Sequence, residues 1–528
     1  MAGIKSLRIL LNFRLFHFAT IPALLICLAT GVGAQTPSNA TFTINPPLSE
    51  PAKSHPMLML TLSGDHQIFL KAYNDFDDLD GDGLPDVTYN HNVVYKGYFN
   101  EEKCYSYSTT NGRFSPAANA TAPAAVDSTL GIREPALSIK QYCANGRWSG
   151  NFLNWATMTR IDIVRSVLYG GKRSTDTATS TILERAYLPN DAHSFAKYYN
   201  GSDITSLTGL SSANYSTNNA NQKLNGLTFC NTSLGHAKNL LSQEQTNTRP
   251  VMRVVRGNYS LWASGERYQC LLGGEDKEYA EYEDGVFANN GNDPSTTGIN
   301  AFSAAPTTVI RDYTVRVAVC TNSTEDDIHY CRRYGTSYKP TGLLQTYGIH
   351  SDNPVLFGLM TGAITKNHTS GVLRKNVASM ADEVNPNNGT FLRPNSGSIV
   401  ASIDALKLLD YTFAIDNNYD RSGTYGVRCP KLSGPGEGVC RNWGNPFSET
   451  LAESYKYFAG TSAQATLNDF LQNERDVLTT ATVANWADPV SSVSDAACVN
   501  MNVLGINSSS NSYDDDINSK SFFQLNIA

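Results

Sequence analysis

The sequence predicts an α/β fold with long loop-rich insertions and additional β structure. Two continuous apolar runs, at 57–62 and 355–360, indicate strands that are buried on both faces. Two other segments, at about 154–169 and 398–409, repeat apolar residues at helical spacing and are predicted as helices. Buried strands together with amphipathic helices therefore indicate a layered core.

The N-terminus is predicted to be an export signal. Positive residues precede an apolar stretch at 18–29, and small residues then lead to a cleavage site after Ala34. The apolar stretch is shorter than a membrane span, although a retained anchor helix is the alternative. We therefore expect a leader at 1–34, a polar linker at 35–56, one folded region at 57–528, and no membrane span after cleavage.

The other elements are predicted in chain order. Residues 87–99 alternate Tyr and Val and are predicted as a hairpin region, and residues 108–135 are predicted as loop. Stretches rich in Asn, Ser, Thr and Gly, at about 200–225 and 284–308, are predicted as insertions or mobile loops. Strands are predicted at 251–255, 260–263, 313–320 and 502–506. A last helix is predicted to begin at Asn445 as N-cap with Pro446 in the first helical position, and to end at Gly460.

The composition fits an oxidising compartment and excludes a nucleic-acid partner. The net charge of -7 offers no basic stripe for phosphates. Ten cysteines suit an exported protein, and they lack the spacing of a zinc site. Cys27 would leave with the leader. Pairing of neighbours is the simplest assignment for the rest: 104 with 143, 230 with 270, 320 with 331, and 429 with 440. Cys498 is left over and could be a free thiol, an intermolecular bridge, or half of a pair with a downstream partner.

The strongest motif is the aspartate loop at 78–86. Calcium takes six to eight oxygen ligands, which carboxylates at alternating positions supply. The predicted ligands are Asp78, Asp80, Asp82, the carbonyl of Leu84, and Asp86 directly or through water. The loop is not an EF-hand, because Tyr89 stands where the bidentate Glu belongs. Its spacing resembles the loops of thrombospondin type 3 repeats and dockerins, and a solvated acidic turn is the alternative.

A second, weaker candidate is the polar loop at 507–512, which follows the last predicted strand. A strand followed by Asp-x-Ser-x-Ser holds magnesium in von Willebrand factor A domains. Here Asn507 replaces the aspartate, with Ser509 and Asn511 at the two later positions. The loop after the first strand, which contains Asp65, also lacks the required order. The sequence predicts at most a remnant of an adhesion site, or a polar turn.

No catalytic motif of the common classes is present in the sequence, which shows neither His-Glu-x-x-His nor Gly-x-Ser-x-Gly nor a phosphate-binding glycine loop. We therefore predict a non-enzymatic protein. The alternatives are a calcium-stabilised secreted hydrolase and a free-standing secreted adhesin.

The chain resembles the PilY family of type IV pilus biogenesis and tip-adhesin proteins. The resemblance rests on a long ordered series of segments: MLML at 57–60, DH at 65–66, AYND at 72–75, DLDGDGLPD at 78–86, YKGYF at 95–99, WSGNFLNW at 148–155, TILERA at 181–186, YKPTGLLQ at 338–345, GVLRKN at 371–376, WGNP at 443–446 and YFAG at 457–460. These segments span nearly all of the chain after the leader.

The resemblance implies a core of the von Willebrand factor A, Rossmann-like type with insertions. It implies minor pilins and the type IV pilus machinery as partners, together with a host or abiotic surface. It also implies a place in the periplasm, at the outer-membrane surface or at the pilus tip, and a role in pilus assembly and twitching motility. Members of the family continue into a C-terminal β-propeller, so this chain is expected to be an N-terminal fragment or a truncated product.

Overall fold

A computed structural model of the chain describes residues 55–189, 193–211, 215, 225–234, 249–259, 270, 282–283, 286–287, 309–321, 331–364, 366–392, 397–409, 437–438, 440–460, 483–491 and 499–514. The predicted leader, most of the predicted linker and the predicted strand at 260–263 lie outside these residues. Among the described residues, no helix is both long enough and apolar enough to cross a membrane.

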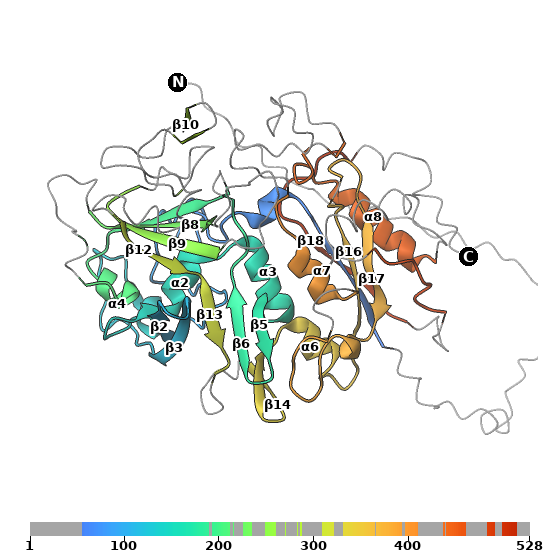
Figure 1. Cartoon of the computed structure of the whole chain (residues 1–528), viewed down its shortest axis with the longest axis horizontal. Helices are drawn as coiled ribbons and strands as arrows, with labels where there is room; N and C mark the ends of the chain where they lie inside the picture. The colour runs from blue at the N-terminus through green and yellow to red at the C-terminus, as the bar shows by residue number, and fades with distance from the viewer. Residues whose placement is uncertain are drawn as a thin grey trace, which may run out of the picture. The chain divides into compact units, whose positions relative to one another are not determined.

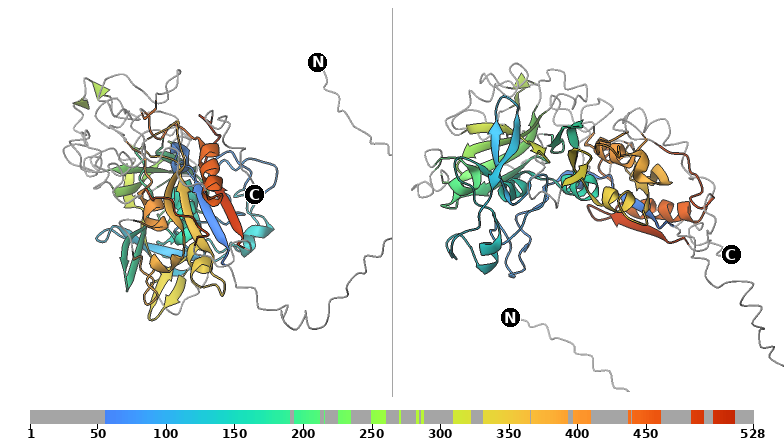
Figure 2. Two further views of the ribbon diagram at one scale, coloured as in Figure 1. Left: turned by 90° about the vertical axis from the view of Figure 1, so that its right-hand side faces the viewer. Right: turned by 90° about the horizontal axis from the view of Figure 1, so that it is seen from below.

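A four-stranded sheet contains the apolar runs that the sequence marked as buried strands. The order is β17-β16-β1-β18, and the strands are β1 (Met57–Leu62), β16 (Leu356–Thr361), β17 (Val372–Ala378) and β18 (Met501–Ile506). β1 runs parallel to both neighbours, whereas β17 is antiparallel to β16. Figures 1 and 2 show β1 beside β18, although they come from opposite ends of the described chain. The three strands predicted at 57–62, 355–360 and 502–506 are confirmed.

Helices cover both faces of this sheet. On one face, α8 (Phe447–Phe458) packs through Tyr457 against Met59 of β1. On the other face, Leu60 belongs to a core shared with α3 (Arg160–Tyr169) and α7 (Ile399–Ala405). The short helix α6 (Leu343–Gly348) also contacts α3 and β16. Because both faces are covered, β1 is a continuous apolar run without polar alternation.

Each predicted helix needs a correction. The segment predicted as one helix at 154–169 forms two, α2 (Gly150–Thr157) and α3, because Thr159 caps the second one in a capping box with Asp162. The helix predicted at 398–409 is shorter and ends at Ala405. The last helix begins at Phe447, later than predicted, since Asn445 and Pro446 lie outside it.

The remaining strands form two further sheets and two short hairpins. The six-stranded sheet has the order β4-β2-β3-β13-β6-β5, and the second four-stranded sheet has the order β12-β9-β8-β7. The bounds are β2 (Lys103–Ser108), β3 (Arg113–Asn119), β4 (Trp148–Ser149), β5 (Arg173–Thr177), β6 (Ser180–Glu184), β7 (Phe195–Tyr199), β8 (Leu227–Leu234), β9 (Arg249–Arg256), β12 (Val309–Thr314) and β13 (Arg316–Val319), with hairpins β10 (Tyr282–Glu283) with β11 (Val286–Phe287) and β14 (Cys331–Tyr334) with β15 (Ser337–Pro340). Short helices are α4 (Ile204–Thr208), η1 (His66–Phe69), η2 (Glu134–Ser138) and η9 (Met380–Asp382).

The strand predicted at 251–255 is confirmed within β9, whereas the one predicted at 313–320 is divided between β12 and β13. The prediction of loop throughout 108–135 is wrong, because β3 and η2 lie there. The loop predicted at 200–225 contains α4.

The hairpin predicted at 87–99 is also wrong. This segment contains no strand, and two asparagines of α2 supply the hydrogen bonds that a neighbouring strand would give. Tyr95 N donates to Asn151 Oδ1 at 2.7 Å, and Asn154 Nδ2 donates to the carbonyls of Tyr95 at 2.8 Å and Phe99 at 2.7 Å. The buried backbone of the segment is thus satisfied by side chains.

Three predicted disulfides are confirmed: Cys104–Cys143, Cys230–Cys270 and Cys320–Cys331. Cys440 is disulfide-bonded as well. Its predicted partner, Cys429, and Cys498 lie outside the described residues. Disulfides of this number are typical of proteins that fold in an oxidising compartment.

Candidate functional site

The aspartate loop is closed at its base and turned by two glycines. Asp86 N donates to the carbonyl of Asp77 at 2.8 Å, which brings the two ends of the loop together. Gly81 and Gly83 adopt φ of 75° and 88°, the left-handed region that residues with a side chain rarely enter. The glycines are therefore required by the path of the backbone and not by crowding, since a Cβ at either position would meet no atom within 4 Å.

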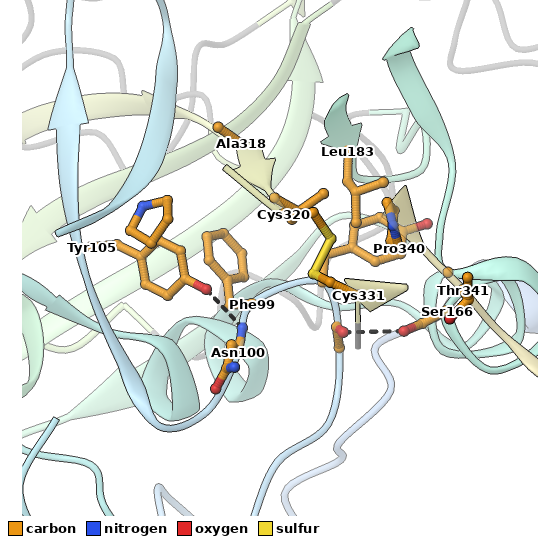
Figure 3. A pocket seen from close by; sticks show the side chains of 15 residues that line it. Phe99, Asn100, Tyr105, Ser166, Leu183, Ala318, Cys320, Cys331, Pro340 and Thr341 are labelled. Atoms are coloured by element: carbon orange, nitrogen blue, oxygen red, sulfur yellow. Dashed lines mark hydrogen bonds between the residues drawn. A yellow bond between two sulfur atoms is a disulfide. The ribbon is translucent and has the colours of Figure 1, made fainter. Parts of the chain in front are cut away.

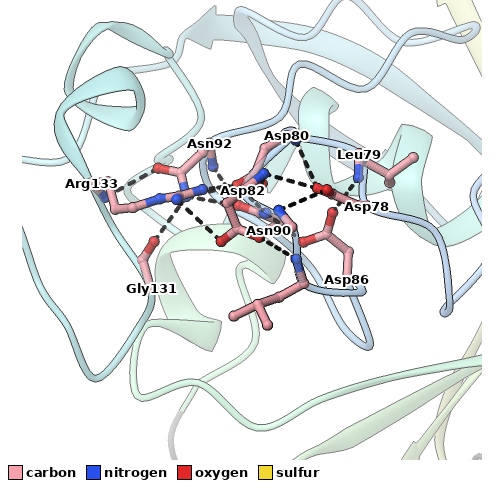
Figure 4. Close-up of polar contacts among 12 residues, drawn as sticks. Asp78, Leu79, Asp80, Asp82, Asp86, Asn90, Asn92, Gly131 and Arg133 are labelled. Atoms are coloured by element: carbon pink, nitrogen blue, oxygen red, sulfur yellow. Dashed lines mark hydrogen bonds and ion pairs between the residues drawn. The ribbon is translucent and has the colours of Figure 1, made fainter. Parts of the chain in front are cut away.

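Three of the predicted carboxyl groups converge. Asp78, Asp80 and Asp86 each place one oxygen within 4.8 Å of the others. The backbone winds around the Asp78 carboxyl group, which accepts hydrogen bonds from Gly81 N at 2.7 Å and Gly83 N at 2.8 Å. Figure 4 shows these side chains directed toward one another. Oxygens at this spacing fit a hard divalent cation such as calcium, whose oxygen ligands lie about 2.3–2.6 Å from the ion.

The other two predicted ligands lie at the margin of this group. One Asp82 oxygen accepts from Leu84 N at 2.8 Å, and another lies 3.1 Å from the guanidinium of Arg133. The Leu84 side chain is 67% exposed. The structure thus brings together Asp78, Asp80 and Asp86, and it places Asp82 between the loop and Arg133.

Three residues around the loop were not predicted. Asn90 Nδ2 donates to Asp80 Oδ2 at 2.6 Å and also to Asp86, and Asn92 N donates back to Asn90 Oδ1 at 2.8 Å. Arg133 forms an ion pair with Asp80. Asn90 and Asn92 continue the alternating spacing of the aspartates, so a motif search extended beyond Asp86 could have found them. Arg133 is distant in sequence and carries no such signal.

The ionised form of the Asp80 carboxyl group is stabilised by its neighbours. Burial by itself would raise the pKa of Asp80, but hydrogen bonds from Asn90 and Arg133 outweigh it and hold the pKa below its usual value. The loop carries four carboxyl groups, and the Arg133 guanidinium pairs with two of them, Asp80 and Asp82, so the donor set suits an additional cation in both chemistry and charge.

The second predicted group lies at the ends of two parallel strands. Asn507, Ser509 and Asn511 follow β18, and Ser509 Oγ donates to Asp65, which follows β1, at 2.6 Å. The structure therefore brings the two loops that sequence analysis compared with a metal site into one cluster. Asn507 Nδ2 donates to Asn511 Oδ1 at 3.0 Å, so these side chains bond to each other.

A cavity of about 50 Å³ lies beside the Cys320–Cys331 disulfide (Figure 3). Two of its polar side chains are already paired: Tyr105 Oη accepts from Asn100 N at 2.7 Å, and Ser166 Oγ donates to Gly97 O at 3.1 Å. No His, Asp, Glu or Lys lines it. This cavity lacks the acid–base pair that the hydrolase alternative requires.

Comparison with known proteins finds one family along most of the chain. The family described as "PilY1 homolog, small alpha/beta domain" matches residues 86–255, and "PilY1 homolog, second domain" matches residues 357–527. A type IV pilus biogenesis factor PilY1 homolog of Xylella fastidiosa is 32% identical over 454 residues, which cover 82% of this chain and 27% of that protein. A second PilY1 homolog of the same organism is 38% identical over 105 residues, 19% of this chain and 8% of the relative. No solved structure matches. The chain spans about a quarter of the length of the first of these two relatives.

Proposed function

The chain belongs to the family of PilY1 homologues, and on that premise we propose that it acts in type IV pilus biogenesis as an exported, non-enzymatic component. The observation that carries the proposal is the identity of 32% across 82% of the chain to a relative named as a pilus biogenesis factor. In this proposal the partners are minor pilins and the pilus machinery, and the protein supports pilus assembly and twitching motility.

Export is supported by three confirmed disulfides. We infer that residues 1–34 are the export signal and that the mature protein resides in the periplasm, at the outer-membrane surface or at the pilus tip. Surface attachment is the second part of the proposal. Phe76, Leu84 and Val87 are 68%, 67% and 72% exposed around the aspartate loop, and exposed apolar side chains in one short segment suit contact with a host or abiotic surface.

The core is proposed to be of the von Willebrand factor A type. The four-stranded sheet supports this assignment, because β1 lies between two parallel neighbours, β17 is an antiparallel edge, and helices cover both faces. An open sheet of this kind binds ligands beyond the carboxyl ends of its strands.

Calcium is proposed to act as a structural clamp on the aspartate loop. Asp78, Asp80 and Asp86 would hold the ion, with Asp82 and the Leu84 carbonyl completing the set. The loop is followed directly by the 87–99 segment, in which Asn90 bonds back to Asp80 and α2 holds the backbone at Tyr95. A bound ion would therefore also stabilise the buried backbone around Tyr95. The ion would supply charge neutralisation there and no chemistry.

Pilus association is tested in the organism that encodes the chain. We expect the protein to be detected in sheared pili, and deletion of its gene to reduce surface piliation, with recovery on complementation by the wild-type gene. A deletion strain that lacks the major pilin serves as the control, because the protein should then be absent from the sheared fraction. Normal piliation in the deletion strain, with the protein shed into the medium from pilin-deficient cells, would instead support a free-standing adhesin.

A further inference from the structure

A polar cluster fills the edge of the sheet where β1 and β18 end. It consists of Ser63 and Asp65 after β1, Asn507, Ser508 and Ser509 after β18, and Asn445 immediately before α8; we call it the edge cluster. In sheets with parallel strands this edge is the usual place for ligands. The residue types, one carboxylate with serines and asparagines, are also those of a magnesium or calcium site.

The single carboxylate of the edge cluster is already satisfied by hydroxyl groups. Asp65 is only 3% exposed, and it accepts hydrogen bonds from Ser508 Oγ and from Ser509 Oγ at 2.6 Å. Ser508 Oγ also lies 2.9 Å from Ser63 Oγ. Burial raises the pKa of Asp65 even though both serines act against the shift. The carboxyl oxygens are therefore used within the cluster.

Asn445 stands at the centre of the remaining oxygens. Its Nδ2 lies 2.8 Å from Asn507 Oδ1, 2.9 Å from Ser509 Oγ, 3.2 Å from Ser509 O and 3.3 Å from Ser510 O. Because Ser509 Oγ gives its proton to Asp65, it can only accept from Asn445, which fixes the amide with its nitrogen toward the oxygens. Its backbone also exchanges hydrogen bonds with Ser512, N to Oγ and O to N, both at 2.9 Å.

The charges nearby oppose a second cation. The Arg160 guanidinium donates to the carbonyl of Ser508 at 3.0 Å and acts electrostatically on Asp65. The one buried carboxylate lies beside an arginine and already accepts two hydroxyl hydrogen bonds, so it offers little net attraction for a divalent ion.

We propose that the Asn445 amide takes the place of a divalent cation in the edge cluster, and that the cluster is a metal-independent latch holding the 507–512 loop to β1 and α8. The neutral Asn445 NH2 group, with its two N–H donors among four oxygens, occupies the position of a cation without carrying its charge. The inference is independent of the aspartate loop, which among the described residues remains the candidate for metal dependence.

The test measures Mn²⁺ binding to the full chain in an Asp80→Ala background, which removes the aspartate loop from the readout. With Asn445 intact we expect no saturable Mn²⁺ binding by electron paramagnetic resonance and no change in Tm. Asn445→Asp replaces the donor by a carboxylate among oxygens, so we expect it to lower Tm without metal and to regain Tm with Mn²⁺. The variant should bind Mn²⁺ saturably under conditions in which the chain with Asn445 intact shows no saturation.

Asn442→Asp is the matched control, because Asn442 is 3% exposed against 4% for Asn445 but bonds to Leu409 N and the Lys407 carbonyl outside the cluster. It should show no response to Mn²⁺. Stoichiometric Mn²⁺ binding to the chain with Asn445 intact, lost on Asn507→Ala, would overturn the proposal, and this arm needs no change at Asn445. A folded Asn445→Asp variant that ignores Mn²⁺ would also overturn it.

Discussion

Replacing Arg165 by leucine is expected to lower the free energy of unfolding by about 3–5 kcal/mol, the usual cost of removing one partner from a buried ionic network. Arg165 is 2% exposed. Its NH2 group donates to the carbonyls of Ile403 and Leu406, both at 3.1 Å, and its Nε lies 3.5 Å from Asp404. These contacts satisfy carbonyls at the C-terminal end of α7, so leucine would leave the carbonyls without this donor and Asp404 with the Tyr169 hydroxyl but no positive neighbour at this side.

Urea unfolding followed by far-UV circular dichroism measures this effect. Arg333→Leu is the control, because Arg333 is an exposed arginine of β14 and should change stability by no more than about 0.5 kcal/mol. Arg165→Lys should recover little, since a single ammonium cannot reach the carbonyls that the guanidinium fork spans. A loss at Arg165→Leu no larger than the control would contradict the assigned role.

Replacing Asn154 by leucine is expected to destabilise the protein by about 3 kcal/mol, because it strands three buried backbone groups at about 1–3 kcal/mol each, partly relieved by rearrangement. The Asn154 side chain is fully buried. It bonds the carbonyls of Tyr95 and Phe99 and accepts from Phe99 N at 3.1 Å. Leucine has a similar volume, so the loss would come from hydrogen bonding and not from a cavity.

The same unfolding measurement applies, with hydrogen exchange of residues 95–99 as a local readout. Exchange there should quicken more than in β1, because the segment depends on α2 for its bonds. Asn111→Leu, at an exposed turn between β2 and β3, is the control. A change below about 1 kcal/mol at Asn154→Leu would show that water or other groups replace the asparagine.

Local signals explain what the sequence could predict. β1 follows from an unbroken apolar run, and the end of α3 follows from Gly170 in the left-handed conformation. The break before α3 also had a local signal, the Thr159-x-x-Asp162 capping box, which a search for helical periodicity alone passes over. The neighbouring cysteines paired because short loops bring such residues together.

Interactions between distant residues explain what the sequence could not predict. Alternation of Tyr and Val in 87–99 imitates a strand, but the buried asparagines of α2 replace the partner strand. The aspartate spacing predicted a convergent group, whereas Arg133 reaches it from another loop. The same holds for Asn445, whose partners at 507–510 are brought close by the packing of α8 against β1 and β18.

Calcium titration of Tm at constant ionic strength tests most directly whether the aspartate loop is a calcium clamp. Wild-type protein should gain stability as RT ln(1 + [Ca²⁺]/Kd), about 2.7 kcal/mol at a hundredfold excess over Kd, and Asp80→Ala should gain none. Glu102→Ala, which removes an exposed carboxylate paired with Lys140 outside the loop, should respond as wild type does. Equal shifts in wild type and Asp80→Ala, or no shift in either, would contradict a calcium clamp at Asp78, Asp80 and Asp86.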